Sequence, residues 1–210
     1  MMKINKLICL VLLLLMFLIT GCNKSNNQNE EEGFKLPTED SVSQKLGGNY
    51  AFTLEFNGHI SFTTKYIVTE NGYYVEYLSD DGDLYTEDEE YAYLYLVESD
   101  ELYYGTKFLL NKKSDKDLFG LGNGLDYLAF FADTNAEEER EALVGGRECI
   151  KYVIDNVSTY TFSCYIDKET GACLRCVARS NDDYYEWTVK ELVIGGQTLT
   201  EQIKKINISK

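Results

Sequence analysis

Residues 50–58 read Tyr-Ala-Phe-Thr-Leu-Glu-Phe-Asn-Gly, and this stretch decides the fold class. Its large apolar side chains alternate with smaller or polar ones, which is the period of a strand with one buried face. The Asn-Gly pair at its end is a strong signal for a two-residue hairpin turn. The stretch therefore predicts a strand that folds back onto a second, antiparallel strand.

The same pattern of alternating strands and turn signals continues along the chain in two series of predicted strands, which we call the first run and the second run. Turn signals recur about every ten to fifteen residues, as is typical of an antiparallel sheet or an open barrel. The strands predicted in the first run are 49–56, 60–70, 73–79, 91–97 and 102–110. Those predicted in the second run are 147–155, 159–166, 173–179 and 184–194. We expect a mainly β, α+β domain.

Short helices are predicted around and between these runs. Ser41-Val42-Ser43-Gln44 has the spacing of a capping box, and Gly47-Gly48 would end a helix there. Between residues 117 and 144 we expect two adjacent helices or one broken helix. The apolar residues there are Leu125, Leu128, Ala129, Phe130, Phe131 and Ala132, and residues 134–137 form a second capping box. Residues 198–206 predict a short final helix.

The N-terminus has the features of an export signal. Lys3 and Lys6 precede an apolar run over residues 7–19, which is too short to span a bilayer but suits a signal peptide. Ile19-Thr20-Gly21-Cys22 resembles the lipobox of bacterial lipoproteins. This resemblance implies cleavage before Cys22 and a diacylglyceryl group, with further acylation, on its sulfur. The alternatives are an ordinary secretory signal or an uncleaved anchor.

These features predict three segments and a location. Residues 1–21 would be the signal peptide, residues 22–40 a flexible polar tether, and residues 41–210 a single folded domain. The mature protein would be exported and lipid-anchored to the outer face of the cytoplasmic membrane, or to an outer membrane if the host has one. Its partners would then be the membrane and the ligand or protein that the domain binds.

Composition narrows the functional classes. The net charge is −15 at pH 7, which disfavours binding to nucleic acid or to anionic lipid headgroups. The chain has 17 tyrosines and one proline, a balance that favours half-buried β structure over disorder.

Two pieces of the second run point to a family. Residues 145–152 form a glycine-led strand, and residues 165–175 form a strand that ends in an Asp-Lys-Glu-Thr-Gly turn. Together they resemble the lipoprotein-carrier superfamily of the LolA/LolB and LppX/LprG type. The resemblance implies a strongly curved antiparallel sheet, an open half-barrel, with one or two short helices packed on its concave side. It also implies that an acyl chain or another hydrophobic ligand is held there. The resemblance itself assigns no ligand-contact residue; the apolar residues of the predicted helical segment, Leu125, Leu128, Phe130 and Phe131, are our candidate lining residues.

Four cysteines of the predicted domain lie in the second run of strands: Cys149, Cys164, Cys173 and Cys176. Their even number in an exported protein suits two disulfides. Two alternatives stay open, namely free buried thiols and a zinc site, since Cys173 and Cys176 have ligand spacing. No metal site is predicted outright.

Catalytic signals are weak. Residues 80–90 are rich in acids but fail the EF-hand pattern, so a solvated hairpin tip is favoured over a calcium site. His59, the single histidine, follows a tight turn and has no triad partner in the sequence. We expect a protein that is not an enzyme and needs no cofactor beyond the lipid on Cys22. A structural or interaction lipoprotein with a filled core is the alternative to a ligand carrier.

Overall fold

The computed structural model describes residues 34–59, 61–78, 91–106, 109–113, 123–157, 159–200, 203 and 207–209. The chain divides into two units, Met1–Glu32 and Gly33–Lys210, and the described residues all belong to the second. The predicted signal peptide, Cys22, the acidic residues 80–90 and most of the predicted final helix lie outside the described residues. No helix among the described residues is long and apolar enough to cross a membrane.

The first run of predicted strands is present in the structure. It gives β2 (Tyr50–Asn57), β3 (Phe62–Thr69), β4 (Gly72–Leu78), β5 (Tyr91–Leu96) and β6 (Glu101–Thr106). The single strand predicted over residues 102–110 is divided, because a separate strand β7 (Leu109–Lys113) pairs back onto β6. Strand β1 (Phe34–Lys35) was not predicted. The second run gives β9 (Arg147–Val157), β10 (Tyr160–Asp167), β11 (Cys173–Arg179) and β12 (Tyr184–Ile194). Two further strands, β8 (Asn135–Val144) and β13 (Asn207–Ser209), were not predicted.

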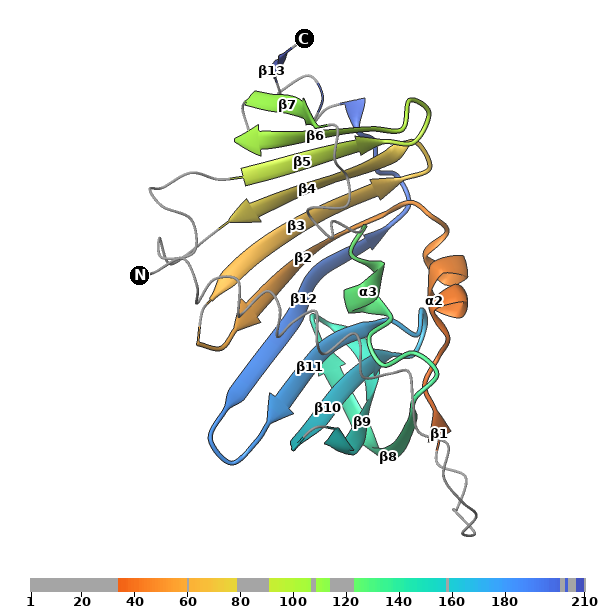
Figure 1. Cartoon of the computed structure of the whole chain (residues 1–210). Coiled ribbons are helices and arrows are strands. Elements are labelled where there is room, and N and C mark those ends of the chain that lie inside the picture. The colour runs from red at the N-terminus through yellow and green to blue at the C-terminus, as the bar shows by residue number, and fades with distance from the viewer. Residues whose placement is uncertain are drawn as a thin grey trace, which may run out of the picture. The chain divides into compact units, whose positions relative to one another are not determined.

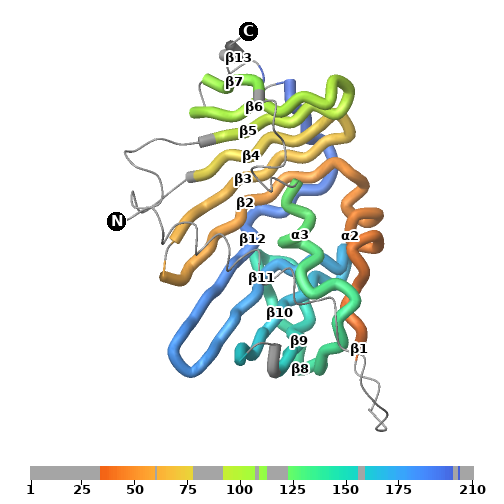
Figure 2. Tube along the Cα trace, in the orientation of Figure 1, coloured from red at the N-terminus to blue at the C-terminus, as the bar shows by residue number. Residues whose placement is uncertain are grey.

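All thirteen strands belong to one sheet whose ends do not meet. Its order is β1-β8-β9-β10-β11-β12-β2-β3-β4-β5-β6-β7-β13, and β13 pairs in parallel with β7 while the other pairs are antiparallel. Figures 1 and 2 show the strands β8–β11 turned across the direction of β2–β7, with the two helices inside the bend. The predicted fold class, a curved open sheet with short helices on one face, is confirmed.

The two runs are joined side by side through β12 and β2. Trp187 lies opposite Phe56, and Val189 lies opposite Leu54. All four side chains belong to the main core or pack against it, so apolar burial specifies this register. The joint places residues from the two runs on one continuous face of the sheet.

Each side of the sheet between β2 and β7 buries its own cluster, as the period of two requires. The main core covers the concave side and includes Leu54, Tyr66, Val75 and Tyr93. The opposite face carries a smaller cluster: Ile67, Tyr74, Ala92, Leu94, Leu110 and Leu199. Alternate residues of each strand from β2 to β6 thus point into different clusters. The strand register therefore tells which residues face the concave side.

Helix α2 (Glu39–Leu46) begins earlier than predicted. Thr38 is its N-cap, and its hydroxyl accepts a hydrogen bond from the Ser41 amide at 3.1 Å. The prediction that the helix starts at Ser41 is therefore wrong, because Thr38, three residues earlier, is the N-cap. Gly47 ends the helix at φ 69°, as predicted.

The folded unit also includes residues that the sequence assigns to the tether. Leu36 is 2% exposed in the main core. Phe34 stacks on Tyr152 with ring centroids 4.8 Å apart. Residues 34–36 thus pack on the sheet through Phe34 and Leu36.

The predicted helical segment is corrected at its C-terminal half. Helix α3 is short (Leu125–Leu128), and residues 135–144 form β8 in place of a second helix. The apparent capping box at residues 134–137 starts a strand because β8 pairs with β1 and β9, and Ala136, opposite Phe34 of β1, and Val144, opposite Arg147 of β9, are both buried. Lys151 also pairs with Glu139, and Lys168 with Glu141, so ion pairs to neighbouring elements offset the low strand propensity of glutamate.

Candidate functional site

The concave face has two different halves. We call residues 124–131, which include α3, the plug. The half of the sheet formed by β3–β6 carries a set of tyrosines that we call the tyrosine face: Tyr66, Tyr73, Tyr77, Tyr93, Tyr95 and Tyr104.

The plug lies close on the sheet because its first residue is a glycine. Gly124 has φ 78°, and a Cβ there would come within 2.6 Å of Phe52 and 2.7 Å of Tyr66. The predicted lining residues Leu125 and Leu128 are buried, at 9% and 0% exposure. They anchor the plug in the core.

The two predicted phenylalanines of the plug pack against β10 and β12. The Phe130 ring meets Trp187 edge-on at 4.6 Å, and the Phe131 ring meets Phe162 at 4.7 Å. Both phenylalanines are half-buried. Phe131 has φ 64°, a strained value for a bulky residue, which its ring contacts hold in place. This half of the concave face is filled by side chains.

The rings of the tyrosine face differ in burial. Tyr73, Tyr77, Tyr95 and Tyr104 are half-buried, whereas Tyr66 and Tyr93 are 4% and 1% exposed. Neighbouring rings on β4 and β5 contact one another. The ring centroid of Tyr73 lies 5.1 Å from that of Tyr95 and 6.0 Å from that of Tyr93, and the centroids of Tyr77 and Tyr93 are 6.2 Å apart. Such a surface is apolar along the rings and polar at the hydroxyls.

Burial changes the acidity of these hydroxyls. It raises the pKa of Tyr93 well above its usual value, and nearby Tyr77 and Tyr66 add to this effect. The pKa of Tyr66 is likewise raised by burial, then by Tyr127, Tyr77 and Asp126. The hydroxyls therefore stay protonated and neutral at physiological pH, and the tyrosine face offers uncharged donors and acceptors.

Among the described residues, two buried side-chain atoms on the concave side have no hydrogen-bond partner, the Thr64 hydroxyl and the Trp187 indole nitrogen. Thr64 is 0% exposed and Trp187 is 7% exposed. Buried polar groups are nearly always paired, so each unpaired one calls for an explanation. Nothing in the sequence marks Thr64, because a threonine in a strand carries no signal of its own.

The four cysteines come together under the β9–β11 part of the sheet. Cys164 and Cys176 are direct cross-strand partners, with their sulfurs 3.5 Å apart. All four are buried and carry free thiols in this structure. Burial raises the pKa of Cys149 to about 12, so its thiol stays protonated. The predicted disulfides stay a prediction.

Among the described residues, no group of three or more His, Cys, Asp or Glu side chains is arranged to hold a metal ion. His59 lies at the surface, 2.9 Å from Asp183, and Tyr160 donates to the same carboxylate. These contacts tie the β2–β3 turn to the β11–β12 turn.

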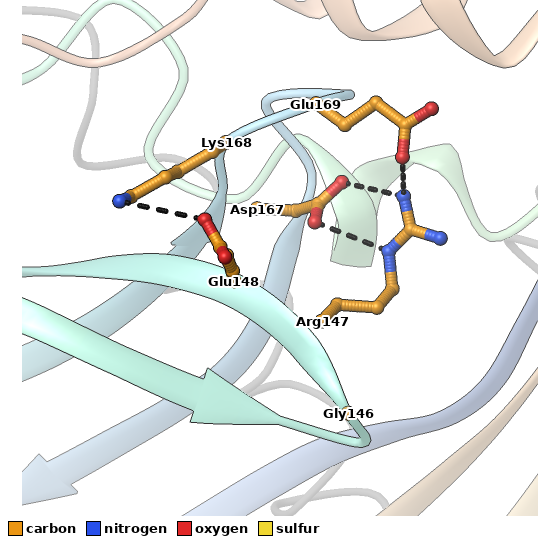
Figure 3. Close-up of a pocket in the computed structure, with 6 residues that line it drawn as sticks. All are labelled: Gly146, Arg147, Glu148, Asp167, Lys168 and Glu169. Atoms are coloured by element: carbon orange, nitrogen blue, oxygen red, sulfur yellow. Dashed lines mark hydrogen bonds and ion pairs between the residues drawn. The ribbon is translucent and has the colours of Figure 1, made fainter.

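A charged hollow of about 480 Å³ lies at the corner where β9 begins and β10 ends. In Figure 3 the Arg147 guanidinium donates two hydrogen bonds to the Asp167 carboxylate, of 3.1 and 2.9 Å, and one to the Glu169 carboxylate, of 2.8 Å. Asp167 also accepts from the Thr170 amide and hydroxyl. Because Asp167 is fully engaged, we assign this cluster to holding the predicted Asp-Lys-Glu-Thr-Gly turn.

No protein-family model matches this sequence, and no curated protein matches it. The structure is similar to the crystal structure of MucB, with 13% identity, 78% of this chain and 59% of that chain covered, and a TM-score of 0.48. LprF from Mycobacterium bovis matches at 10% identity over 77% of this chain and 98% of that chain, with a TM-score of 0.41.

The LolA superfamily is also among the structural neighbours. A member from Nitrosomonas europaea matches at 10% identity over 79% of this chain and 96% of that chain, with a TM-score of 0.36. This chain spans 59% of the MucB chain. Because all three TM-scores lie below 0.5, we derive function from the contacts within this chain.

Proposed function

We propose that this chain is a lipid-anchored lipoprotein of the cell envelope that binds a hydrophobic ligand against its tyrosine face. The observation that carries the ligand proposal is the set of half-buried rings on three adjacent strands: Tyr73, Tyr77, Tyr95 and Tyr104. A continuous apolar surface of this kind is more typical of a binding site than of ordinary protein surface. The anchor rests on the lipobox-like residues 19–22.

The ligand would lie beside the plug and not under it. Phe130 and Phe131 already occupy the face of β10 and β12 through their contacts with Trp187 and Phe162. The plug reaches the tyrosine face through Tyr127, whose ring centroid lies 6.2 Å from that of Tyr66, and Tyr73, Tyr77, Tyr95 and Tyr104 are half-buried. In this proposal the plug is a fixed part of the fold, and the ligand binds on the surface beside it.

Neighbouring tyrosines of β6 supply a matched test. Tyr104 belongs to the concave side, whereas Tyr103 points to the opposite face and donates to Glu101. Tyr104→Lys puts a charge on the proposed binding surface and should weaken binding of the apolar fluorophore N-phenyl-1-naphthylamine at least ten-fold. Tyr103→Lys sets a cation beside Glu101 and should leave binding unchanged. Equal effects of the two substitutions would contradict the assignment.

A second function, a protein-interaction lipoprotein, is favoured by the packed plug. A filled half of the concave face is what a structural module needs, and tyrosine is enriched at protein interfaces. The same pair of variants separates the two functions. Under the interaction proposal the parent chain does not bind the fluorophore, and native mass spectrometry finds no lipid that co-purifies with it.

A further inference from the structure

Three buried cysteines of the β10–β11 hairpin point to the same side of the sheet. Cys164 of β10 lies directly opposite Cys176 of β11, and Cys173 of β11 lies opposite Ile166. A β-bulge after Tyr165 shifts the register by one residue. Cys173 and Cys176 therefore point the same way in spite of their odd spacing along the strand. The Cys173 sulfur is within hydrogen-bonding reach of the sulfurs of both other cysteines.

One pair of these three has the separation that a disulfide requires. The sulfurs of Cys164 and Cys176 are 3.5 Å apart. Residues directly opposite on antiparallel strands have Cα atoms about 4.5–5.5 Å apart, which is inside the range of about 4.4–6.8 Å that a disulfide spans. Diagonal neighbours are about 7–8 Å apart, so a bond from Cys164 to Cys173 would need the backbone to move. The register therefore selects Cys164 and Cys176.

The fourth cysteine, Cys149, faces other residue types on both neighbouring strands. It lies opposite Asp167 of β10 and Ala142 of β8. Its thiol donates to the Arg147 carbonyl at 3.6 Å. Because burial raises its pKa to about 12, this thiol stays protonated and is a poor nucleophile. Cys149 is therefore placed as a structural thiol.

We propose that Cys164 and Cys176 are joined by a disulfide, made by exchange with a small-molecule disulfide as the chain folds, and that Cys149 and Cys173 remain thiols. The protein thus has one bridge where the even number of cysteines suits two. The bridge fixes the two strands that flank the Asp-Lys-Glu-Thr-Gly turn. The inference does not depend on a hydrophobic ligand; it rests on the proposed function only in that export would bring the chain to an oxidising compartment.

The bond forms before the plug packs on the sheet. In the folded chain both thiols are 0% exposed, but Cys164 and Cys176 are twelve positions apart and meet as soon as their local hairpin forms. Cys176 lies opposite Trp187, which Phe130 of the plug later covers.

The chemistry is thiol–disulfide exchange in two steps. One protein thiolate attacks the external disulfide, which gives a mixed disulfide and releases one small thiol. The second protein thiolate attacks the protein sulfur of the mixed disulfide and releases the other small thiol. The two protein thiols lose two electrons and two protons, and the external disulfide takes them up as two thiols.

The test uses the chain from residue 22 onward with Cys22→Ser, which contains the whole unit Gly33–Lys210 and leaves four cysteines. The reduced, unfolded chain is refolded with oxidised and reduced glutathione, its free thiols are blocked with N-ethylmaleimide, and it is cut with trypsin. Cleavage after lysine and arginine puts each cysteine on its own peptide: 148–151, 152–168, 169–175 and 176–179. Mass spectrometry should find 152–168 linked to 176–179 and the other two peptides alkylated. Any other pattern, including four alkylated thiols, would overturn the pairing.

Thermal unfolding measures the same bond independently. A disulfide that closes a loop of this length should make the oxidised parent melt about 6–12 °C above its reduced form. Cys176→Ala should abolish this shift, whereas the control Cys173→Ala removes a neighbouring buried thiol and should keep it. Each variant is compared with its own reduced form, so a general loss of stability cancels. A shift that Cys173→Ala abolishes and Cys176→Ala keeps would contradict the inference.

Failure of the inference and failure of the proposed function look different. If the parent binds N-phenyl-1-naphthylamine and all four thiols are alkylated after refolding, the inference is wrong and the hydrophobic-ligand function stands. If the peptides are linked as expected and the parent does not bind the fluorophore, the inference stands and the hydrophobic-ligand function is wrong.

Discussion

At the scale of single residues, Asp167 is the clearest case of a polar side chain that the fold depends on. It is 2% exposed and bonded to Arg147 and Thr170. Burial works to raise its pKa, but the hydrogen bonds from Arg147 and Thr170 outweigh burial and hold the pKa below its usual value. Asp167→Asn should therefore lower the free energy of unfolding at pH 7 by about 2–3 kcal/mol, the range for hydrogen bonds to a charged group.

The acid dependence of this loss has a definite sign. A carboxyl whose folded pKa is depressed stabilises the protein above its unfolded pKa of about 3.9, and this contribution disappears as the pH falls through the folded pKa. Urea unfolding of parent and variant should thus differ most at neutral pH and converge in acid. The control Glu169→Gln alters the exposed partner of the same Arg147 and should have little effect. A pH-independent difference would contradict this account.

Sequence patterns predicted the Asp167 turn but not its partners. The turn was readable because glycine stands where the backbone needs a positive φ, at Gly171 with φ 75°. The role of Arg147 could not be predicted. Arg147 precedes Asp167 by twenty residues, and the two side chains meet only because β9 pairs with β10. Thr64 was missed for the same reason, since only the three-dimensional contacts show that its hydroxyl is unpaired.

At the scale of elements, the plug and β8 show where local signals mislead. Helical spacing correctly located α3, but four helical residues are too few to be stable without packing. Residues 134–144 carry glutamates and a capping pattern, yet they form a strand because the sheet edge at β9 offers them a partner. Tertiary pairing overrides weak helix propensity there.

The packing of the plug gives a prediction about its rigidity. Phe131→Asp would place a carboxylate against Phe162 and Phe130, so we expect the free energy of unfolding to fall by about 3 kcal/mol or more. Leu143→Asp is the control, because Leu143 is 73% exposed on β8 and should tolerate the same charge. Thermal unfolding of both variants measures the difference. A Phe131→Asp chain as stable as its control would mean that the plug is not fixed.

At the scale of the whole molecule, the two meanders were predictable and their junction was not. Hairpin signals order β2–β6 and β9–β12 by chain neighbourhood, whereas the β6–β7 hairpin falls inside a stretch predicted as one strand. The pairing of β12 with β2 joins residues more than a hundred positions apart, and no local motif encodes it. It follows from burying Trp187 with Phe56 and Val189 with Leu54, which is a property of the complete sheet.

The last prediction concerns how the whole chain is held at the membrane. If Cys22 carries the lipid, two or three acyl chains would anchor the protein, because each buried CH₂ contributes about 0.8 kcal/mol and a single chain binds only marginally. Cys22→Ser should abolish labelling by a radioactive or clickable fatty acid and leave an uncleaved precursor on a gel. Cys9→Ser, inside the predicted signal peptide, is the matched control and should be labelled and processed like the parent. Normal acylation of the Cys22→Ser chain would exclude Cys22 as the anchor and leave an ordinary secretory signal or an uncleaved one as the explanation of residues 7–19.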